Sequence, residues 1–261
     1  MIKDLIHNFY LRQFLWNSQL IFDRKIYINS NEYWKNSKNS LLGKRGFVIG
    51  NGPSLRMKDL DKIKNDFSIA SNKIYLAFNE TDWRPNICTI ADRLLWNKIK
   101  YDFENHFSQI FISSSFFDYP NNINCIKIPL LGEWKGYKPI ISNNILDGIY
   151  TFRTITIANL QIAMHLGLNP IYIIGCDHYY SGEESSSESH IKTIVKKQSN
   201  HFIKGYRQEG EKVNYAPIEI MTSGYNYVED FAKKNNIKIY NATRGGYLES
   251  FERINFDQLF K

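Results

Sequence analysis

Short apolar runs, separated by polar and turn-rich stretches, dominate the middle of this 261-residue chain. A short apolar run that stops at a glycine or a polar cluster is typical of a strand buried on both faces of a sheet. The pattern predicts such strands at residues 46–49, 67–70, 87–90, 109–112, 170–175 and 237–240. Helical or turn-rich segments lie between them, and this alternation predicts an α/β fold with a mostly parallel sheet covered by helices on both faces.

Apolar residues at helical spacing predict the main helices. The clearest pattern covers residues 154–166, and Gly167 is a suitable stop for that helix. A second helix is expected to begin at Ser54, directly after the first strand, and a third near residues 223–235. Residues 181–215 are polar and rich in Ser, Glu and Lys, so we expect a lid beside the site there rather than sheet.

The N-terminal part has its own pattern. Apolar and aromatic residues recur at nearly helical spacing over residues 5–16, with basic residues among them, which predicts an amphipathic helix. We favour a helix packed on the domain over an interfacial membrane anchor. Residues 29–44 are rich in Asn, Ser and Lys and are expected to form a linker. The predicted organisation is a helix and linker over 1–43 and a catalytic domain over 44–261.

Composition narrows the class of partner and the compartment. The formal charge of +7 and the pI of about 9.1 suit anionic partners, but no zinc finger, RNA-recognition signature or arginine-rich tail accompanies them, so no nucleic-acid partner is expected. Three cysteines without metal-ligand spacing indicate a reducing compartment. The chain shows neither a signal-peptide core nor a run near the roughly 20 apolar residues that span a bilayer, so we expect a cytoplasmic protein.

A glycine-rich turn joins the first strand to the helix that follows it. Its residues are Gly50, Asn51, Gly52, Pro53 and Ser54. Glycines allow backbone N–H groups to approach an anion, and a helix N-terminus adds a favourable dipole. The turn is neither a Walker loop nor the dinucleotide fingerprint. Phosphate binding is therefore one interpretation, and a plain turn between a strand and a helix is the other.

Polar side chains also follow the most apolar strand of the chain. They belong to the segment Gly175, Cys176, Asp177, His178, Tyr179 and Tyr180. In open α/β sheets, ligands bind at the carboxyl ends of the strands, where these groups would emerge. A carboxylate there can accept hydrogen bonds from a ribose or a base, and a histidine can titrate near neutral pH. The alternative is a turn-capping Asp177 and a surface His178.

Histidines in the predicted lid are candidates for a general base. His201 precedes cationic Lys204 and Arg207, and His190 lies earlier in the same segment. Such a base suits a reaction that deprotonates an acceptor hydroxyl while a phosphate leaves. The sequence contains no His/Cys metal cluster and no Asp-X-Asp after a strand, so we predict no cofactor and no essential metal.

In this order, the motifs resemble bacterial sialyltransferases that extend lipooligosaccharide from CMP-sialic acid. The wider related family includes flagellin nonulosonate transferases and archaeal hydroxymethylpterin pyrophosphokinases. The resemblance covers residues 46–180 and rests on the segments 48–55, 65–67, 71–75, 163–167 and 171–177. It implies a variant glycosyltransferase-A domain, with a lid and no metal requirement.

The resemblance also implies roles for individual residues. Asn51 and Asn72 would contact the phosphate and the ribose of CMP, and Asp177 would lie beside the cytidine. Asp92 falls where that family has an asparagine near the donor, and Thr154 falls on a threonine that contacts the donor.

The resemblance extends to the groups that would take part in the reaction. Tyr180 or Tyr179 is similar to tyrosines that bind the departing phosphate. The family's catalytic histidine aligns nearer Gly205 than His201. We take His201 as the base, with His178 second and His190 third.

The leading hypothesis is an inverting glycosyltransferase that moves a sialic acid-type, nonulosonic or related ulosonic sugar from a CMP-activated donor to a hydroxyl of a bacterial surface glycan. The acceptor would be a glycan or lipid-linked glycan of lipopolysaccharide or capsule biosynthesis, reached by peripheral contact with the inner membrane. A pterin-alcohol pyrophosphokinase using ATP and magnesium, and a non-catalytic nucleotide- or glycan-binding subunit, are the alternatives. The oligomeric state stays open, with a homo-oligomer among the options.

Overall fold

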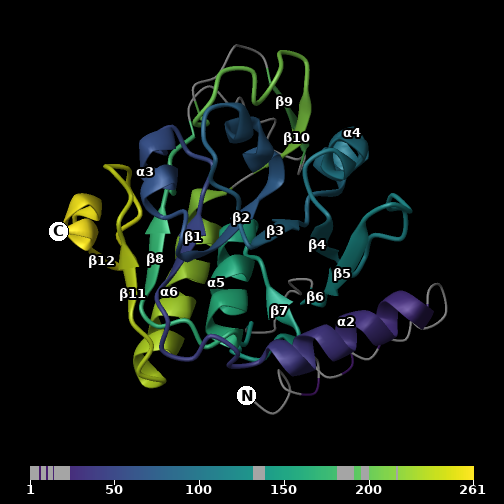
Figure 1. Cartoon of the computed structure of the whole chain (residues 1–261), viewed down its shortest axis with the longest axis horizontal. Coiled ribbons are helices and arrows are strands. Elements are labelled where there is room, and N and C mark those ends of the chain that lie inside the picture. The colour runs from purple at the N-terminus through teal and green to yellow at the C-terminus, as the bar shows by residue number, and fades with distance from the viewer. Residues whose placement is uncertain are drawn as a thin grey trace.

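A single parallel sheet forms the centre of the protein (Figure 1). The computed structural model describes residues 6, 10, 14, 24–131, 139–180, 191–194, 200–215 and 217–261. The strands of the sheet are β1 Gly46–Ile49, β2 Phe67–Ser71, β3 Ile87–Ile90, β4 Gln109–Ser113, β5 Asn124–Ile128, β8 Ile171–Ile174, β11 Ile239–Asn241 and β12 Glu252–Arg253. Their order is β12-β11-β8-β1-β2-β3-β4-β5, and all their pairings are parallel.

Helices and two small sheets surround this centre. The helices are α2 Arg24–Ser37, α3 Met57–Lys62, α4 Arg93–Glu104, α5 Ile155–His165 and α6 Ile218–Lys234, with 3-10 helices η1 Asn72–Asn79, η2 Ile145–Asp147 and η3 Phe256–Phe260. The small sheets pair β6 Leu130–Leu131 with β7 Ile149–Tyr150, and β9 Ile191–Thr193 with β10 Lys212–Asn214.

Alternation along each strand divides the core into two layers. Val48 of β1 packs in one cluster with residues of α2, α5 and α6, whereas its neighbours Phe47 and Ile49 pack in another with residues of α3, α4 and η3. Successive side chains of a strand point to opposite faces, so a strand without an exposed side chain must be covered on both sides. The predicted α/β fold, a mostly parallel sheet with helices on both faces, is confirmed.

The element boundaries confirm most of the predicted strands. They also move the first residue of one predicted helix and of one predicted strand. The helix expected from Ser54 begins at Met57, after a turn. The last predicted strand begins at Ile239 rather than at residue 237. The predicted helix over 154–166 is α5, with Thr154 as its N-cap and Gly167 in the left-handed region at φ 83° after its end.

The linker predicted over residues 29–44 is wrong for residues 29–37, because residues 24–37 form α2, which lies along edge strand β5 (Figure 1). Two side chains of α2 bind the backbone of that strand. The Ser30 hydroxyl accepts from Lys127 N–H at 2.9 Å, and Trp34 Nε1–H donates to the Lys127 carbonyl at 2.7 Å. A sheet edge exposes unpaired backbone groups unless another element covers it. The polar composition of α2 hid this role.

Most of the predicted amphipathic helix near the N-terminus lies outside the described residues. Of its positions, Ile6, Tyr10 and Phe14 are helical and exposed. Among the residues that the structure describes, no helix combines the length and the apolar composition needed to cross a membrane.

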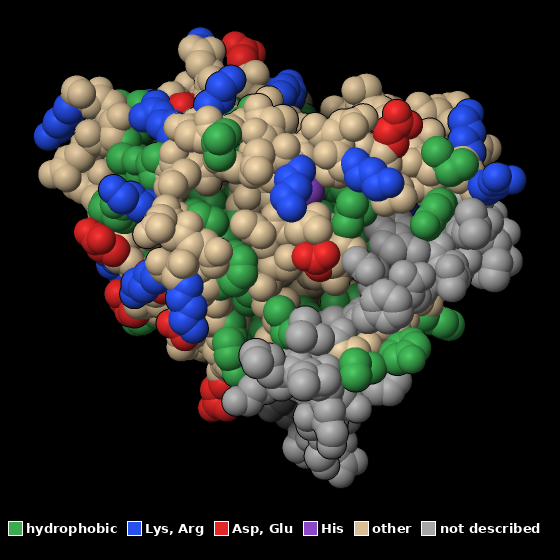
Figure 2. Space-filling view, turned by 90° about the horizontal axis from the view of Figure 1, so that it is seen from below, with side chains coloured by type: hydrophobic (Ala, Val, Ile, Leu, Met, Phe, Trp, Pro, Cys, Tyr) green, Lys and Arg blue, Asp and Glu red, His purple; other side chains and the backbone are tan. Residues whose placement is uncertain are grey.

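The charged side chains can be followed on one face of the molecule. Figure 2 shows the end of the molecule opposite the carboxyl ends of the strands, with Lys and Arg spread over the surface and Asp and Glu interspersed among them. Ion pairs between charged side chains of the described residues include Lys233 with Glu229 and Arg253 with Glu249. On the face that Figure 2 shows, the basic side chains are therefore distributed as on an ordinary protein surface.

The contact between α2 and β5 predicts a large effect of Trp34→Ala. Trp34 is 0% exposed and its indole is hydrogen-bonded to the edge strand, so its removal leaves a cavity and an unpaired carbonyl. We expect a loss of about 3–5 kcal/mol in the free energy of unfolding, measured by urea denaturation. Ile28→Ala, at a 47% exposed position of the same helix, is the control and should cost far less. Equal effects of the two changes would show that α2 is not part of the cooperative core.

Candidate functional site

A cavity of about 350 Å³ opens where strands β1 and β8 part. From β1 the chain proceeds through β2 to β5 toward one edge of the sheet. Strands β8, β11 and β12 lie between β1 and the other edge. Segments that leave neighbouring strands in opposite directions open a crevice at the carboxyl ends, and ligands bind there in open α/β sheets. Of the predicted site residues, the cavity is lined by Gly50, Asn51, Gly52, Asn72, Asp92, Thr154, Gly175, Cys176, Asp177, His178, Tyr179, Tyr180 and His201.

The glycine turn after β1 is packed against the end of β8. Gly50 N–H donates to the Ile174 carbonyl and Gly52 N–H to the Gly175 carbonyl, each at 2.8 Å. A Cβ on Gly50 would lie 2.3 Å from the Gly175 oxygen, so only glycine fits. These two N–H groups are used within the protein and do not cradle a phosphate, and phosphate binding by the rest of the turn stays a prediction.

Ser54 and Pro53 do not line the cavity. Ser54 instead binds Asp177, whose Oδ2 accepts from the Ser54 hydroxyl at 2.8 Å and from the Ser54 N–H at 3.3 Å. Burial raises the pKa of Asp177, and these hydrogen bonds oppose that rise. Ser54 therefore orients a half-buried carboxyl group at the end of β8.

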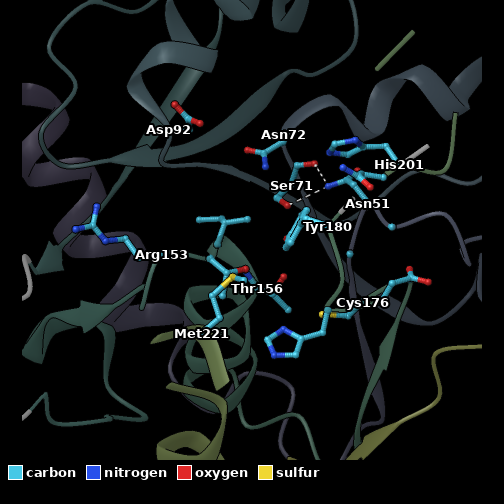
Figure 3. A pocket seen from close by; sticks show the side chains of 18 of the residues that line it. Asn51, Ser71, Asn72, Asp92, Arg153, Thr156, Cys176, Tyr180, His201 and Met221 are labelled. Atoms are coloured by element: carbon cyan, nitrogen blue, oxygen red, sulfur yellow. Dashed lines mark hydrogen bonds between the residues drawn. The ribbon is translucent and has the colours of Figure 1, made fainter. Parts of the chain in front are cut away.

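Asn51 and Asn72 present unpaired acceptors. The Asn51 Nδ2 group donates to the Ser71 carbonyl at 3.1 Å, which fixes the orientation of the amide. Asn72 begins η1 with φ 57° in the left-handed region. The Oδ1 atoms of both side chains are buried without a hydrogen-bond partner in the described part of the chain, and both side chains lie on the same side of the cavity (Figure 3). A buried acceptor without a partner is costly, so this side of the cavity is suited to a ligand that carries N–H or O–H groups.

His201 lies beside these two asparagines (Figure 3). Its ring stacks on Tyr206, with centroids 3.9 Å apart and planes 7° apart. Its neighbour Phe202 donates its N–H to the Asn51 carbonyl at 3.1 Å, so this segment is tied to the glycine turn. Burial, assisted by Arg207 and Lys73, lowers the pKa of His201 to about 3. The imidazole is therefore neutral near pH 7 and able to accept a proton, but it is a weak base in this state.

His178 has a fixed tautomer. Its Nε2 lies 2.7 Å from the Thr222 hydroxyl, which itself donates to the Ile218 carbonyl at 2.9 Å. A hydroxyl has one proton, so Thr222 accepts from Nε2–H, and neutral His178 carries its lone pair on Nδ1. Burial lowers the pKa of His178. Its φ of 55° is in the left-handed region, which is unusual for a residue with a side chain and is frequent at functional sites.

The two predicted tyrosines lie in different surroundings. Tyr180 is half-buried and lies in the cavity between Asn51 and Thr156 (Figure 3). Tyr179 is 53% exposed and packs on Tyr247, with ring centroids 5.5 Å apart. Of the two, Tyr180 is therefore placed to contact a group deep in the cavity.

Asp92 and Thr154 are N-caps of helices that begin at the cavity wall. Asp92 Oδ1 accepts from Leu95 N–H at 3.1 Å and from Asn214 Nδ2–H at 2.8 Å. Thr154 Oγ1 accepts from Thr156 N–H at 3.4 Å.

The Cys176 thiol lies 3.2 Å from the Tyr225 hydroxyl. Burial raises the pKa of this thiol to about 11, so it is protonated and unreactive.

The predicted lid contains more order than expected. Its residues 200–215 contribute Asn200, Tyr206 and Arg207 to the cavity wall, and β9 and β10 form a two-stranded antiparallel sheet, which corrects the expectation of no sheet. His190 lies outside the described residues. Arg207 is paired with Glu211 at 2.9 Å.

Sequence reasoning missed Arg153. It lines the cavity on the side away from His201 and has a φ of 64° (Figure 3). Its position directly before the cap of α5 was the available signal.

Within 24–131, 139–180 and the other described segments, no three His, Cys, Asp or Glu side chains are grouped to hold a metal ion.

The fold is a parallel α/β fold with a cavity at the point where the strand order reverses. The model of the family described as "6-hydroxymethylpterin diphosphokinase MptE-like" matches residues 17–183, and the chain belongs to this family.

Among curated proteins, none matches the chain. The structure of MAf glycosyltransferase from Magnetospirillum magneticum AMB-1 is similar over 86% of this chain, with a TM-score of 0.47 and 12% identity. The chain spans 37% of the length of that protein.

The unpaired Oδ1 atom predicts that Asn51→Ala weakens nucleotide binding. We expect a loss of about 1–3 kcal/mol in the binding free energy of CMP, measured by calorimetry, because a hydrogen bond from the ligand to a buried acceptor disappears. Asn79→Ala, at an exposed position at the end of η1, is the control. CMP affinity unchanged in both variants would remove Asn51 from the site.

Proposed function

We propose that this chain is a glycosyltransferase that moves a sialic acid-type, nonulosonic or related ulosonic sugar from a CMP-activated donor to a hydroxyl of a bacterial surface glycan. The observation that carries the proposal is that one cavity holds two unpaired carbonyl acceptors, those of Asn51 and Asn72, together with neutral His201. A nucleotide supplies donors to such acceptors, and a neutral imidazole accepts the proton of an attacking hydroxyl.

The nucleotide fits the cavity by its donor groups. Ribose hydroxyls and the amino group of cytosine donate hydrogen bonds, and Asn51, Asn72 and Asp177 are the acceptors available to them. Asn51 offers its oxygen rather than its nitrogen, because Nδ2 is bound to Ser71. We therefore assign Asn51 to a hydroxyl or amino group of the nucleotide and not to the phosphate that the family resemblance implied.

The proposed reaction is a single displacement. The acceptor oxygen forms a bond to the anomeric carbon, the bond from that carbon to the CMP phosphate breaks, and CMP leaves with the electron pair. His201 receives the proton of the acceptor hydroxyl, and the product is inverted because no enzyme nucleophile takes part. The Tyr180 side chain lies in the cavity, and we assign its hydroxyl to donate to the leaving phosphate.

Donor binding would also make His201 a stronger base. Its pKa is low because of burial and then because of cationic Arg207 and Lys73. A bound phosphate carries negative charge, offsets these two cations and raises the pKa toward neutrality. His178, with its lone pair on Nδ1, is the second candidate for the base.

The family description favours a second candidate function, pyrophosphoryl transfer from ATP to a pterin alcohol. This reaction requires magnesium, which usually binds one or two carboxylates together with the phosphates. The carboxylates in the cavity, Asp92 and Asp177, follow β3 and β8, which β1 and β2 separate. Three strand spacings of about 4.8 Å place them roughly 14 Å apart, so they would not share one ion and each would supply a single carboxylate. A non-catalytic binding subunit is the third candidate.

The proposed acceptor is a glycan or lipid-linked glycan of lipopolysaccharide or capsule. We propose that the enzyme needs no cofactor or essential metal, and that it works in the cytoplasm with peripheral contact to the inner membrane. A homo-oligomer is compatible with this function.

A thermal-shift panel of CMP, CDP, UDP, GDP and ATP, with and without magnesium, tests the proposal. A ligand that binds only the folded state stabilises it, by about 2.7 kcal/mol at 100 times its dissociation constant. We expect CMP to raise the melting temperature most, equally with and without magnesium. Stabilisation by ATP that requires magnesium would instead support the diphosphokinase, and no response to any nucleotide would contradict both enzymes.

The role of His201 predicts a loss of turnover without a loss of donor affinity. His201→Ala should lower the turnover number by about 10²–10⁴-fold, the usual contribution of a positioned base, while CMP affinity stays nearly constant. NMR titration should place the pKa of His201 near 3 without ligand and higher with CMP.

Two results decide which histidine is the base. His106→Ala, at an exposed position outside the cavity, is the control and should retain full activity. An active His201→Ala with an inactive His178→Ala would transfer the role of base to His178.

A further inference from the structure

Two exposed tyrosines lie side by side at the edge of the cavity. Tyr179 lines the cavity and is 53% exposed, and Tyr247 is 69% exposed. Their ring centroids are 5.5 Å apart and the planes are 48° apart. Aromatic rings that lie together and exposed next to a pocket offer a surface on which a ligand can pack.

Tyr247 is held in place by its own backbone. Its N–H donates to the Asp177 carbonyl at 2.8 Å, two residues before Tyr179. The preceding Gly246 has φ 72°, and a Cβ there would lie 2.7 Å from the Asp177 Cα, so only glycine permits this contact. The segment after β11 is therefore bound to the segment after β8, and the backbones that carry the two rings are held next to each other.

Two arginines stabilise the segment that carries Tyr247. Arg253 donates to the carbonyls of Gly245 and Gly246 at 2.8 and 2.9 Å. Arg244 forms paired hydrogen bonds with Asp59 and Asp257 at distances of 2.7 to 2.9 Å. Charge-assisted, paired hydrogen bonds are the strong ones, so this loop is ordered before any ligand arrives. A surface that is already ordered pays less conformational entropy when it binds.

We propose that Tyr179 and Tyr247 form a platform on which a pyranose ring of the acceptor glycan stacks. The proposal rests on the proposed function and names the place of its second substrate. The C–H groups on one face of a pyranose pack against aromatic rings, and a phenol adds a hydroxyl that can bond to those of the sugar. Tyrosine supplies this contact area at low cost in side-chain entropy, because it has only two rotatable bonds before the ring.

The platform lies apart from the groups assigned to the donor. The unpaired Oδ1 atoms of Asn51 and Asn72 are buried, whereas both rings of the platform are exposed. A donor nucleotide would therefore occupy the interior, and the acceptor would approach over the rim. Tyr179 belongs to both regions, so a sugar stacked on it lies next to the donor.

Saturation-transfer NMR with methyl β-D-galactoside and methyl β-D-glucoside tests the platform. We expect transfer to the protons of one pyranose face in the unchanged protein. In Tyr247→Ala the affinity should fall about two- to tenfold, which corresponds to the usual contribution of an aromatic contact. Tyr247→Phe should retain binding, because it keeps the ring. Tyr101→Ala is the matched control, since Tyr101 is 67% exposed on α4 and does not line the cavity.

Calorimetry with CMP on the same variants separates this proposal from the proposed function. Unchanged CMP affinity in Tyr247→Ala, with weaker glycoside binding, supports the platform. Weaker CMP binding in Tyr247→Ala would show that the rings hold the nucleotide base, and it would overturn the platform. The platform also fails if neither glycoside binds, or if Tyr247→Ala binds them normally, although CMP binding would still support the proposed function. Glycoside binding without any CMP binding would instead contradict the donor assignment alone.

Discussion

The close approach of the chain after β1 to the chain after β8 is the contact on which the rest of the site depends. Gly50 and Gly52 donate to carbonyls at the end of β8, and a side chain on either glycine would collide with this segment. The approach places Ser54 against Asp177, and the backbone of Asp177 in turn binds Tyr247. Three separate loops are thus aligned by one contact between two strand ends.

This packing also decides the chemistry that the cavity offers. Because the N–H groups of Gly50 and Gly52 are used within the protein, the glycine turn provides few donors to a ligand. The buried Oδ1 atoms of Asn51 and Asn72 offer acceptors instead. An anion gains little from such oxygens, whereas a sugar or a base gains a hydrogen bond from each. The cavity is therefore better suited to the hydroxyl or amino groups of a ligand than to a chain of phosphates held by the backbone of the turn.

The strands of the sheet were predictable, because a short apolar run such as Phe47-Val48-Ile49, which ends at a glycine, is too short for a typical helix and fits a buried strand. Strand β5 was missed because it carries Lys127, which is fully buried beside α2. That helix was missed for the related reason that only Ser30 and Trp34 of its residues are buried. A composition rich in Asn, Ser and Lys indicates exposure on average, but two inward side chains suffice to anchor a helix on a strand edge.

The candidate site shows the same division between local and distant information. Asp177, Asn51 and Thr154 were predictable because each directly follows a strand or precedes a helix, and the position alone brings it to the cavity. The pairing of His178 with Thr222 and of Tyr179 with Tyr247 depends on which strands and helices become neighbours, and no local pattern encodes that. A Gly-Asn-Gly turn is equally ambiguous in isolation. Its N–H groups face a ligand or a neighbouring strand according to how closely that strand approaches, so the function of the motif follows from the topology of the sheet.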